Sequence, residues 1–325
     1  MNIILRKRLH MLFNTLSASS SLDLLRYVDI DHFRESERYA SAESIPLMAG
    51  HFAVLRASLA LPSCSLSLVR TFPRIINGYD LSGRLMIVVP MNEISSTRVN
   101  GKEVGQSLIL LKGRANCTVY EPESRLVAIL SIRPEALHDH WLRFDQGHVL
   151  LRLPDMKLAG VQMLVRGILE TAANQPEAVR AQGLLEAMQA TLFSCFDDAM
   201  SRGQVNRRCA RTRYKEIVDR VDRAMNTNWV TDLNCERLAD EIGISVRTMH
   251  TAVHAVCGSS PHRYGQLKRL WAVRRQLRNG APGLTVRASA FAHGFWHMGD
   301  FSRLYRETLG ELPSQTLANA RRPLA

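Results

Sequence analysis

One segment of twelve residues, 245–256, contains two histidines, one arginine and two threonines but no aspartate or glutamate. These polar side chains are Arg247, Thr248, His250, Thr251 and His254. Residues three and four positions apart share a face of a helix, so these donors would lie opposite Met249, Ala252 and Val253. Such side chains donate hydrogen bonds to base edges and phosphates without bringing negative charge. The segment therefore predicts a helix that enters the major groove of DNA.

The residues before this segment predict the element that would hold it in place. Residues 236–242 form an expected short helix, in which the small Ala239 lets a second helix approach closely. Gly243 follows where the turn needs a positive φ, and Ser245 is suited to cap the next helix. Two short helices around a glycine also occur in proteins that never bind DNA. A second copy of the pattern is therefore the important observation.

A second unit of the same design follows farther along the chain. Residues 285–293 predict a short helix, Gly294 a turn, and residues 297–307 a recognition helix with Phe301 and Leu304 facing inward. Its candidates for DNA contact are His297, Ser302, Arg303 and Arg306. Each candidate in either unit has an alternative role as a phosphate contact or a solvated surface residue, because backbone contacts predominate in protein–DNA interfaces.

The helix expected between the two units, residues 261–278, is strongly basic. Among its basic residues are Lys268, Arg269, Arg274, Arg275 and Arg278. As a rigid spacer it would present the recognition helices to successive major grooves, roughly 34 Å apart on one face of the duplex. If Lys268 and Arg269 face the DNA backbone, neutralising either one should weaken binding to all sequences and flatten its salt dependence.

The charge distribution favours a polyanionic partner. The chain has 42 Lys and Arg against 30 Asp and Glu, a net charge of +12. From Arg207 onward there are 20 basic and 10 acidic residues, so most of the excess lies in the last third. Such an excess suits nucleic acid or an anionic membrane surface, but no apolar run approaches membrane-spanning length, and no membrane partner is expected. The six scattered cysteines indicate a reduced, cytoplasmic protein.

The first two thirds of the chain predict a different architecture, an antiparallel sandwich or barrel. The expected strands, rich in Val, Ile, Leu and Thr, are 52–59, 66–72, 85–89, 108–111 and 126–132. Two Asn-Gly pairs, at Asn77 and Asn100, are typical of tight hairpin turns between such strands.

After Pro154, apolar residues recur every three or four positions, which predicts two amphipathic helices separated by a break at 174–176. The stripes are Leu158, Val161, Val165, Ile168 and Leu169 in one helix and Leu185, Met188, Leu192 and Phe196 in the next. These stripes either cover the sheet or are shared with a second subunit. The expected divisions are a leader outside the fold at 1–20, a β-rich domain at 21–200, a linker at 201–213 and a helical domain at 214–325.

The chain resembles the AraC/XylS family of transcription regulators over about residues 214–317. The first unit shares Leu238-Ala239, Gly243-Ile244-Ser245, Met249 and Gly258-x-x-Pro261-x-x-Tyr264. The second shares Ala290-x-x-x-Gly294-Phe295, Phe301-Ser302-Arg303, Tyr305-Arg306 and Gly310-x-x-Pro313-Ser314. Three positions depart from the family pattern. Ser289 stands where a branched apolar residue is usual, and Thr251 and Gly299 stand where longer side chains are usual, so Arg247, His250, His297 and Arg303 are the favoured base contacts.

The resemblance implies an α+β protein with an N-terminal antiparallel, cupin-like β-barrel followed by two helices, and a C-terminal all-α domain with two helix-turn-helix units joined by a long helix. It further implies a cytoplasmic homodimer that binds double-stranded promoter DNA, recruits RNA polymerase and activates transcription. A small-molecule effector is expected, but the sequence does not identify it. The alternative is a regulator that needs no ligand and whose barrel only dimerises.

An enzyme is the weaker alternative, and neither catalytic residues, a cofactor nor a metal is expected. Metal-dependent cupins use a His-x-His pair followed by Glu and a later His. Here the His-x-His pair, His138 and His140, follows the last expected strand, where a surface or structural role is favoured. Four arginines lie on or beside expected strands, and an inward one could pair with an acidic effector, although strand arginines more often face outward. They are Arg56, Arg70, Arg84 and Arg98.

Overall fold

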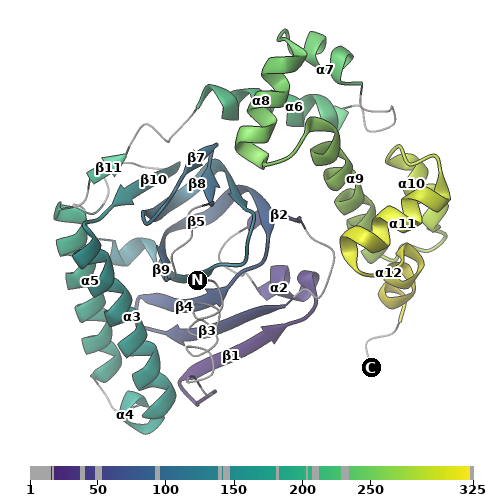
Figure 1. Ribbon diagram of the computed structural model, residues 1–325. Helices are drawn as coiled ribbons and strands as arrows, with labels where there is room; N and C mark the ends of the chain where they lie inside the picture. The colour runs from purple at the N-terminus through teal and green to yellow at the C-terminus, as the bar shows by residue number, and fades with distance from the viewer. Residues whose placement is uncertain are drawn as a thin grey trace, which may run out of the picture.

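The structure is a computed structural model, and the description concerns the residues that it places. These are 16, 18–36, 41–47, 53–91, 96–137, 141, 147–180, 183–202, 204–206, 212–227 and 234–322. The described chain has an N-terminal antiparallel sheet and a C-terminal helical region, which confirms the predicted α+β class (Figure 1).

The described strands form one antiparallel sheet, with the order β1-β3-β4-β9-β5-β8-β10-β11 along its main path. Strand β2 pairs with β5, and the β6–β7 hairpin joins the sheet through β8. The bounds are β1 (Leu22–Tyr27), β2 (Ser41–Pro46), β3 (Val54–Ala60), β4 (Cys64–Arg70), β5 (Arg74–Pro90), β6 (Arg98–Val99), β7 (Lys102–Glu103), β8 (Leu108–Glu121), β9 (Leu126–Ile132), β10 (Gly147–Arg152) and β11 (Gln204–Asn206).

The long strand β5 makes the sheet curve. Its first part pairs with β2 and its last part with β9, while β8 follows it along both. Between these parts the register with β8 shifts from Asp80 to Leu85, where Ser82 and Gly83 have φ values of 50° and 80°. Such an irregularity lets a strand bend without losing its pairing on either side.

The two Asn-Gly pairs have different outcomes. Asn100 and Gly101, at φ values of 52° and 81°, form the turn between β6 and β7, which confirms that prediction. The prediction for Asn77 is wrong, because Asn77 and Gly78 lie inside β5. There the register with β8 shifts between Asn77 and Tyr79, so the positive φ of Gly78 serves a bulge within a strand.

Helices cover one side of the sheet, as Figure 1 shows, and the predicted amphipathic pair is confirmed. They are α3 (Asp155–Asn174), the short α4 (Pro176–Arg180) and α5 (Leu184–Arg202), while the seven-residue α2 (Ile30–Ser36) follows β1 and the single turn η1 (Pro134–Ala136) follows β9. The predicted stripe of α3 and most of that of α5 are buried in a core shared with the sheet. Within the described chain the stripes therefore cover the sheet.

Two residues of the expected leader belong to the fold. Leu16 is buried in the same core, and the hydroxyl of Ser19 donates a hydrogen bond to the carbonyl of Ala172 in α3 at 2.9 Å. Exclusion of the whole leader from the fold is therefore wrong for these positions. In the expected linker, Gln204–Asn206 forms β11 and pairs with β10, so part of this stretch extends the sheet.

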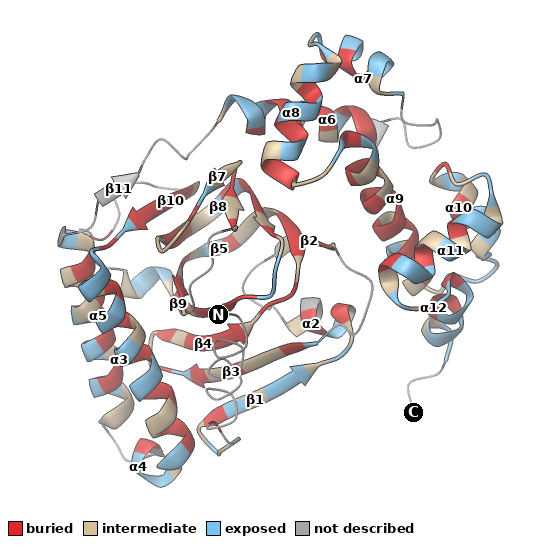
Figure 2. Cartoon of the chain, in the orientation of Figure 1, coloured by how far each residue is buried: buried red, intermediate tan, exposed pale blue. Residues whose placement is uncertain are grey.

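The C-terminal region is helical throughout its described residues. Its helices are α6 (Arg213–Thr227), α7 (Cys235–Glu241), α8 (Val246–Cys257), α9 (Pro261–Arg278), α10 (Val286–Ala292), α11 (Met298–Leu309) and α12 (Pro313–Ala320). Figure 2 shows that α9 is buried along most of its length, whereas α8 and α11 have both buried and exposed faces. Helix α9 contributes to one core with α6, α7 and α8 and to another with α10, α11 and α12, so it links two small packed units.

Candidate nucleic-acid interface

The first helix-turn-helix unit is built from local capping interactions. Asn234 begins α7 by accepting hydrogen bonds from the backbone N–H groups of Glu236 and Arg237. Gly243 makes the turn at a φ of 63°, and Ser245 caps α8 by accepting from the N–H of Thr248 at 3.1 Å. These interactions satisfy N–H groups that a helix start leaves without partners, and they fix the direction of α8.

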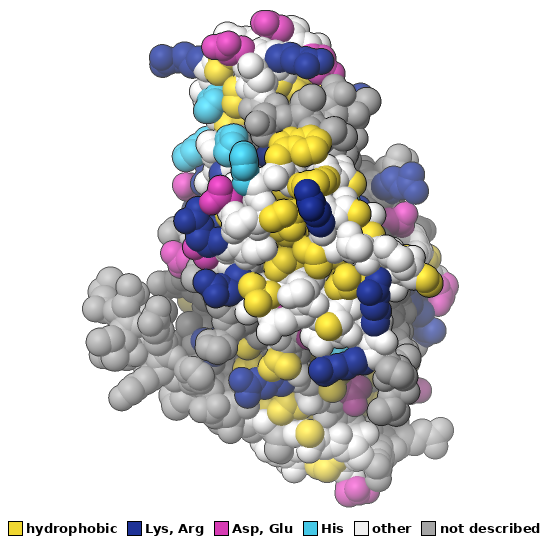
Figure 3. All heavy atoms as spheres, turned by 90° about the vertical axis from the view of Figure 1, so that its right-hand side faces the viewer, with side chains coloured by type: hydrophobic (Ala, Val, Ile, Leu, Met, Phe, Trp, Pro, Cys, Tyr) yellow, Lys and Arg dark blue, Asp and Glu magenta, His cyan; other side chains and the backbone are white. Residues whose placement is uncertain are grey.

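The inward face of α8 is buried as predicted, with Met249, Ala252 and Val253 fully inaccessible to solvent. The outward face leaves four of the five candidate DNA contacts exposed. These are Arg247, His250, Thr251 and His254. Histidine side chains gather high on the face of the molecule that Figure 3 presents.

The two threonines of α8 are less available than the sequence indicates. Thr248 is half-buried, and its hydroxyl lies 2.8 Å from that of Ser245. Thr251 is exposed, but its hydroxyl donates to the carbonyl of Arg247 at 2.9 Å. Both hydroxyls are therefore engaged within the helix, and Arg247, His250 and His254 are the side chains of this face best able to reach DNA.

The second unit repeats this construction. Thr285 caps α10 through the N–H of Ala288 at 3.1 Å, and Gly294 forms the turn at a φ of 74°. Phe301 and Tyr305 anchor α11 in the core. Its predicted inward residue Leu304 is half-buried.

The candidate DNA contacts of α11 differ in exposure. His297, Arg303 and Arg306 are exposed, and Ser302 is half-buried. Arg303 is engaged by a carboxylate that the sequence reasoning did not consider, since its Nη2 lies 2.9 Å from Oδ1 of Asp300. Both side chains are largely exposed, at 65% and 72%, so this ion pair is weak and can be exchanged for DNA contacts.

The expected role of the basic helix α9 needs correction. Lys268 and Arg269 have only 6% and 7% of their surface exposed, so they do not face DNA. Lys268 forms an ion pair with Asp222 of α6 at 3.0 Å, and the Arg269 guanidinium lies over the ring of Phe295 at 5.3 Å. The prediction assumed that basic residues of a helix face solvent. Here α9 is enclosed by both units, so its long side chains form ion pairs and ring contacts.

Two further arginines of α9 pair with the N-terminal domain. The Nη2 of Arg274 lies 3.0 Å from Asp31, and the Nε of Arg278 lies 3.2 Å from the same carboxylate. Arg274 also contacts Glu311 of the loop before α12. Among the lysine and arginine residues of α9, Arg275 is the exposed one.

Ser289, one of the three departures from the family pattern, is fully buried in α10. Its hydroxyl donates a hydrogen bond to Oε1 of Gln276 in α9 at 2.7 Å. A polar contact between the two helices thus replaces the apolar contact that a branched side chain would make.

An exposed aromatic residue, Trp296, was not recognised from the sequence. It immediately precedes the N-cap of α11 and has 49% of its surface exposed. Its ring packs at 5.6 Å from that of Phe291, over which the Arg287 guanidinium lies at 5.1 Å. The first residues of a recognition helix are those that contact base edges, so position and exposure place Trp296 beside the candidate interface. A tryptophan immediately before the expected recognition helix was the available signal.

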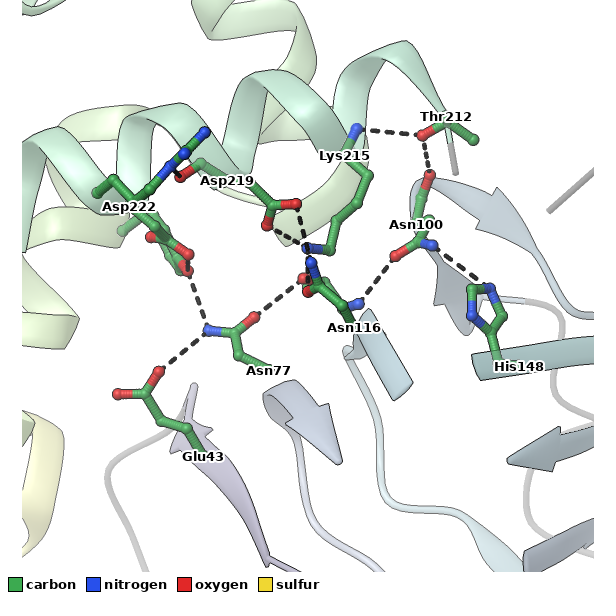
Figure 4. Close-up of polar contacts among 12 residues, drawn as sticks. Glu43, Asn77, Asn100, Asn116, His148, Thr212, Lys215, Asp219 and Asp222 are labelled. Carbon is green, nitrogen blue, oxygen red and sulfur yellow. Dashed lines mark hydrogen bonds and ion pairs between the residues drawn. The ribbon is translucent and has the colours of Figure 1, made fainter. Parts of the chain in front are cut away.

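A polar network joins the first unit to the N-terminal domain, as Figure 4 shows. We call this set the interdomain network, and its members are Glu43, Asn77, Asn100, Asn116, Thr118, His148, Thr212, Lys215, Asp219, Asp222, Tyr264 and Lys268. Asn77 of β5 is central: its amide donates to Tyr264 Oη at 3.1 Å and its carbonyl accepts from Thr118 at 3.0 Å. Tyr264 in turn donates to Asp222 at 3.2 Å.

The network buries ionisable groups. Burial raises the pKa of Asp222, against the opposing charge of Lys268, and burial raises the pKa of Tyr264 well above its ordinary value. Closer to the β6–β7 turn, Lys215 donates to Asn116 at 2.9 Å and the Thr212 hydroxyl donates to the carbonyl of Asn100 at 2.9 Å. These two hydrogen bonds join the start of α6 to the N-terminal sheet.

In the N-terminal domain, the sequence singles out four strand arginines and a His-x-His pair. Arg56, Arg70, Arg84 and Arg98 are all half-buried, and His138 and His140 lie outside the described residues. The domain's deeply buried arginines are instead Arg74 and Arg125, which both pair with Glu121, at 2.8 and 3.3 Å.

In the part of the chain that the structure describes, no group of three or more His, Cys, Asp or Glu side chains is arranged to hold a metal ion. None of the described helices combines the length and hydropathy needed to cross a membrane.

Comparisons with known proteins agree with this geometry. Residues 238–319 match a helix-turn-helix domain family. The XylDLEGF operon transcriptional activator 1 of Pseudomonas putida is 34% identical over 102 residues, which cover 30% of this chain and 30% of that relative. The chain therefore matches less than a third of that relative's length.

Two solved structures are also similar to parts of the chain. A probable AraC family transcriptional regulator from Rhodopseudomonas palustris is 36% identical, with 33% of this chain and 99% of that chain covered and a TM-score of 0.31. The AraC-like transcriptional activator CuxR is 13% identical over 82% of this chain and 97% of its own, with a TM-score of 0.44.

Proposed function

Since the chain belongs to the AraC/XylS family of transcriptional regulators through its C-terminal region, we propose that it binds double-stranded promoter DNA and regulates transcription. The observation that carries the proposal is the pair of helix-turn-helix units on one helix, α9, each with exposed cationic or imidazole side chains on its second helix. Helices α8 and α11 enter successive major grooves. Arg247, His250, His297 and Arg303 contact bases there.

The protein acts as a homodimer in the cytoplasm, and it activates transcription by recruiting RNA polymerase. The name of the Pseudomonas putida relative, a transcriptional activator, supports activation. The cupin-like N-terminal domain binds a small-molecule effector and passes the binding event to the first unit. The interdomain network supports this route, because it connects β5 to α9 through Asn77 and Tyr264 and connects β8 to α6 through Asn116 and Lys215. Strand β2 joins the network through Asn77, and β10 joins it through Asn100 of the β6–β7 turn.

The experiment that tests this function is selection of bound fragments from the source genome by the full-length protein at fixed salt. We expect enrichment of two half-sites about one helical turn apart, because each recognition helix occupies one major groove. An Arg247→Ala variant should lose the base preference of one half-site and an Arg303→Ala variant that of the other. Binding that falls with salt but enriches no sequence would show a nonspecific polyanion binder and refute the proposal.

The effector can be tested against its alternative separately. Metabolites, beginning with those handled by genes near the enriched sites, would be screened for a rise in the thermal midpoint of the full chain, because a ligand of the native state stabilises it. A compound that raises the midpoint and changes DNA affinity supports effector control. If no metabolite does so, and DNA occupancy follows protein concentration alone, the domain only dimerises. Turnover of a metabolite would favour an enzyme.

A further inference from the structure

Arg98, at the start of β6 in the N-terminal domain, reaches across to the first recognition helix. Its Nη1 donates hydrogen bonds to the carbonyl oxygens of Ala255 at 2.9 Å and His254 at 3.3 Å, near the end of α8. The guanidinium also lies over the ring of Tyr120 at 4.7 Å. These contacts hold the cation beside the exposed face of α8, although Arg98 belongs to another domain.

A surface hollow of about 550 Å³ lies at this junction. Its lining residues are Arg98, His250, Thr251, His254, Ala255 and Ser260. This lining combines a guanidinium, two imidazoles and the hydroxyl of Ser260, and it contains no carboxylate. The Thr251 hydroxyl also borders the hollow but donates its proton within α8. The hydrogen bonds described for Arg98 use Nη1 alone, while a guanidinium has five N–H donors. The chemistry of the hollow therefore suits an anion with several acceptor oxygens.

The hairpin that carries Arg98 is fixed to the DNA-binding region. The side-chain carbonyl of Asn100 accepts from the N–H of Thr118 at 2.8 Å, and its backbone carbonyl accepts from Thr212 at 2.9 Å. A Cβ on Gly101 would lie 3.4 Å from the backbone of Ala255, so the turn rests directly on α8. These contacts position Arg98 against the recognition helix.

We propose that this hollow binds a phosphate of the DNA backbone and that Arg98 of the N-terminal domain supplies the cationic contact. The proposal rests on the proposed function, namely that α8 enters the major groove. That groove is about 12 Å wide, and a helix with its side chains nearly fills it, so groups that border the outward face of α8 meet the flanking backbone. Guanidinium groups bind phosphate through two parallel hydrogen bonds. One cationic contact of this DNA-contacting surface thus comes from outside the helix-turn-helix domain, while the other lining residues belong to α8 and the start of α9.

The test measures how the DNA affinity of the full-length protein depends on salt, using a duplex enriched in the selection described above. Arg98→Ala should weaken binding on the order of tenfold at low salt, because a hydrogen bond to a charged group is lost. It should also reduce the slope of log affinity against log salt by about 0.9, the value for one phosphate. Arg98→Lys keeps the charge and should retain most of the slope.

Arg114→Ala is the matched control. Arg114 also lies on the sheet, in β8, with 81% of its side chain exposed, so the variant removes the same charge away from the hollow. It should leave the slope unchanged. In a second experiment, single phosphates of the duplex are replaced by uncharged methylphosphonates. The wild type should lose affinity when one phosphate beside the first half-site is replaced. Arg98→Ala should bind that duplex as tightly as the unmodified one.

Three results would overturn the phosphate contact. Tighter binding by Arg98→Ala would mean that the hairpin opposes DNA binding, and weaker binding with an unchanged slope would mean that Arg98 acts only by holding the domains together. A third result is that inorganic phosphate raises the thermal midpoint of the wild type but not that of Arg98→Ala, while the two proteins have equal salt slopes on DNA. The hollow would then bind a free anion. Failure of the wild type to select any sequence would instead refute the proposed function, so the two failures are distinguishable.

Discussion

The phenol ring of Tyr120, in β8, occupies the space that a side chain on Gly258 would need. A Cβ built on Gly258 would lie 2.0 Å from Cζ of Tyr120, far inside van der Waals contact. Gly258 also ends α8 in the left-handed conformation, at a φ of 69°. A single glycine therefore both terminates the first recognition helix and admits a ring from the other domain.

Gly258→Ala should consequently destabilise the protein for two reasons, which Gly243→Ala separates. Gly243 has a φ of 63° but nothing within 4 Å of its Cβ position. Its alanine variant should therefore lower the free energy of unfolding only by the cost of the left-handed conformation, about 1–2 kcal/mol. Gly258→Ala should lower it by about 1–3 kcal/mol more, because the new methyl group overpacks against Tyr120. Denaturant titration gives both free energies of unfolding. Adding Tyr120→Ala should recover part of the Gly258→Ala loss, and equal losses at the two glycines would contradict the clash.

The buried pair of Asp222 and Lys268 predicts a non-additive response. Asp222→Asn leaves the Lys268 ammonium buried without its counter-ion and should lower the free energy of unfolding by about 3–5 kcal/mol. The double variant Asp222→Leu with Lys268→Met removes both charges and should be more stable than either single variant. Both measurements use denaturant titration of the full chain. Additive losses would mean that the two residues do not act as a pair.

The same pair predicts how stability depends on pH. Burial raises the pKa of Asp222 above the ordinary value of 3.8 in the unfolded chain, so folding favours the protonated carboxyl. The stability that this group contributes is present below 3.8 and is lost as the pH rises through the raised value. As the pH rises from 3.8 through the raised pKa of Asp222, we therefore expect the free energy of unfolding of the wild type to fall relative to that of the double variant. If it rises instead, the pKa of Asp222 is not raised by folding.

Substitutions of Arg303 and Asp300 should have opposite effects on DNA binding. Arg303→Ala should cost about 1–3 kcal/mol of binding free energy and relax base preference in the groove of α11. Asp300→Ala removes a carboxylate from the same face and releases Arg303 from their 2.9 Å ion pair, so it should strengthen binding to random duplex. Gel-shift titrations on selected and random DNA measure both effects. If Arg303→Ala costs the same on either DNA, Arg303 contacts a phosphate.

Substitution of Trp296 should lower DNA affinity without lowering the stability of the fold. Its ring is half exposed next to the start of α11, so Trp296→Ala should weaken sequence-specific binding while the thermal midpoint stays nearly constant. Leu312→Ala is the control, since Leu312 has 36% of its surface exposed in the loop before α12. A large drop in the midpoint for Trp296→Ala alone would mean that the ring mainly supports α10 and α11.

The recognition helices could be predicted from the sequence because their signals are local. A cap such as Ser245, a turn glycine such as Gly243 and an inward residue such as Met249 each act within a few positions along the chain. Helix periodicity likewise located α3 and α5. The same reasoning placed Asn100 correctly in a hairpin, because a two-residue turn is specified by its own residues.

The features that were not predicted depend on contacts distant in sequence. Lys268 is buried because Asp222, 46 positions earlier, supplies its counter-ion. Asn77 lies in a strand because β2 and β8 pair with it on either side, which overrides the local preference of Asn-Gly for a turn. Arg98 is brought to α8 by a contact spanning 157 positions, so its place beside the candidate interface was not readable from the residues around it.

The proposed homodimer leads to a last prediction, on the outward face of α3. Met156 and Met163 of that helix are 85% and 73% exposed, although the opposite face is buried against the sheet. Gly160 and Gly167 lie between and after them with open space at their Cβ positions, which allows another helix to approach closely. Apolar side chains exposed to this degree on one helix face suit a second copy of the chain.

Met156→Lys combined with Met163→Lys should convert the dimer to a monomer, because two charges would have to be desolvated in the interface. Both side chains are exposed, so the thermal midpoint at low protein concentration should change little. Val28→Lys is the control: Val28 is 69% exposed between β1 and α2 and should leave the mass unchanged. Sedimentation velocity over a range of concentrations measures the mass. A double variant that remains dimeric would place the interface elsewhere, whereas a monomeric wild type would refute the homodimer itself.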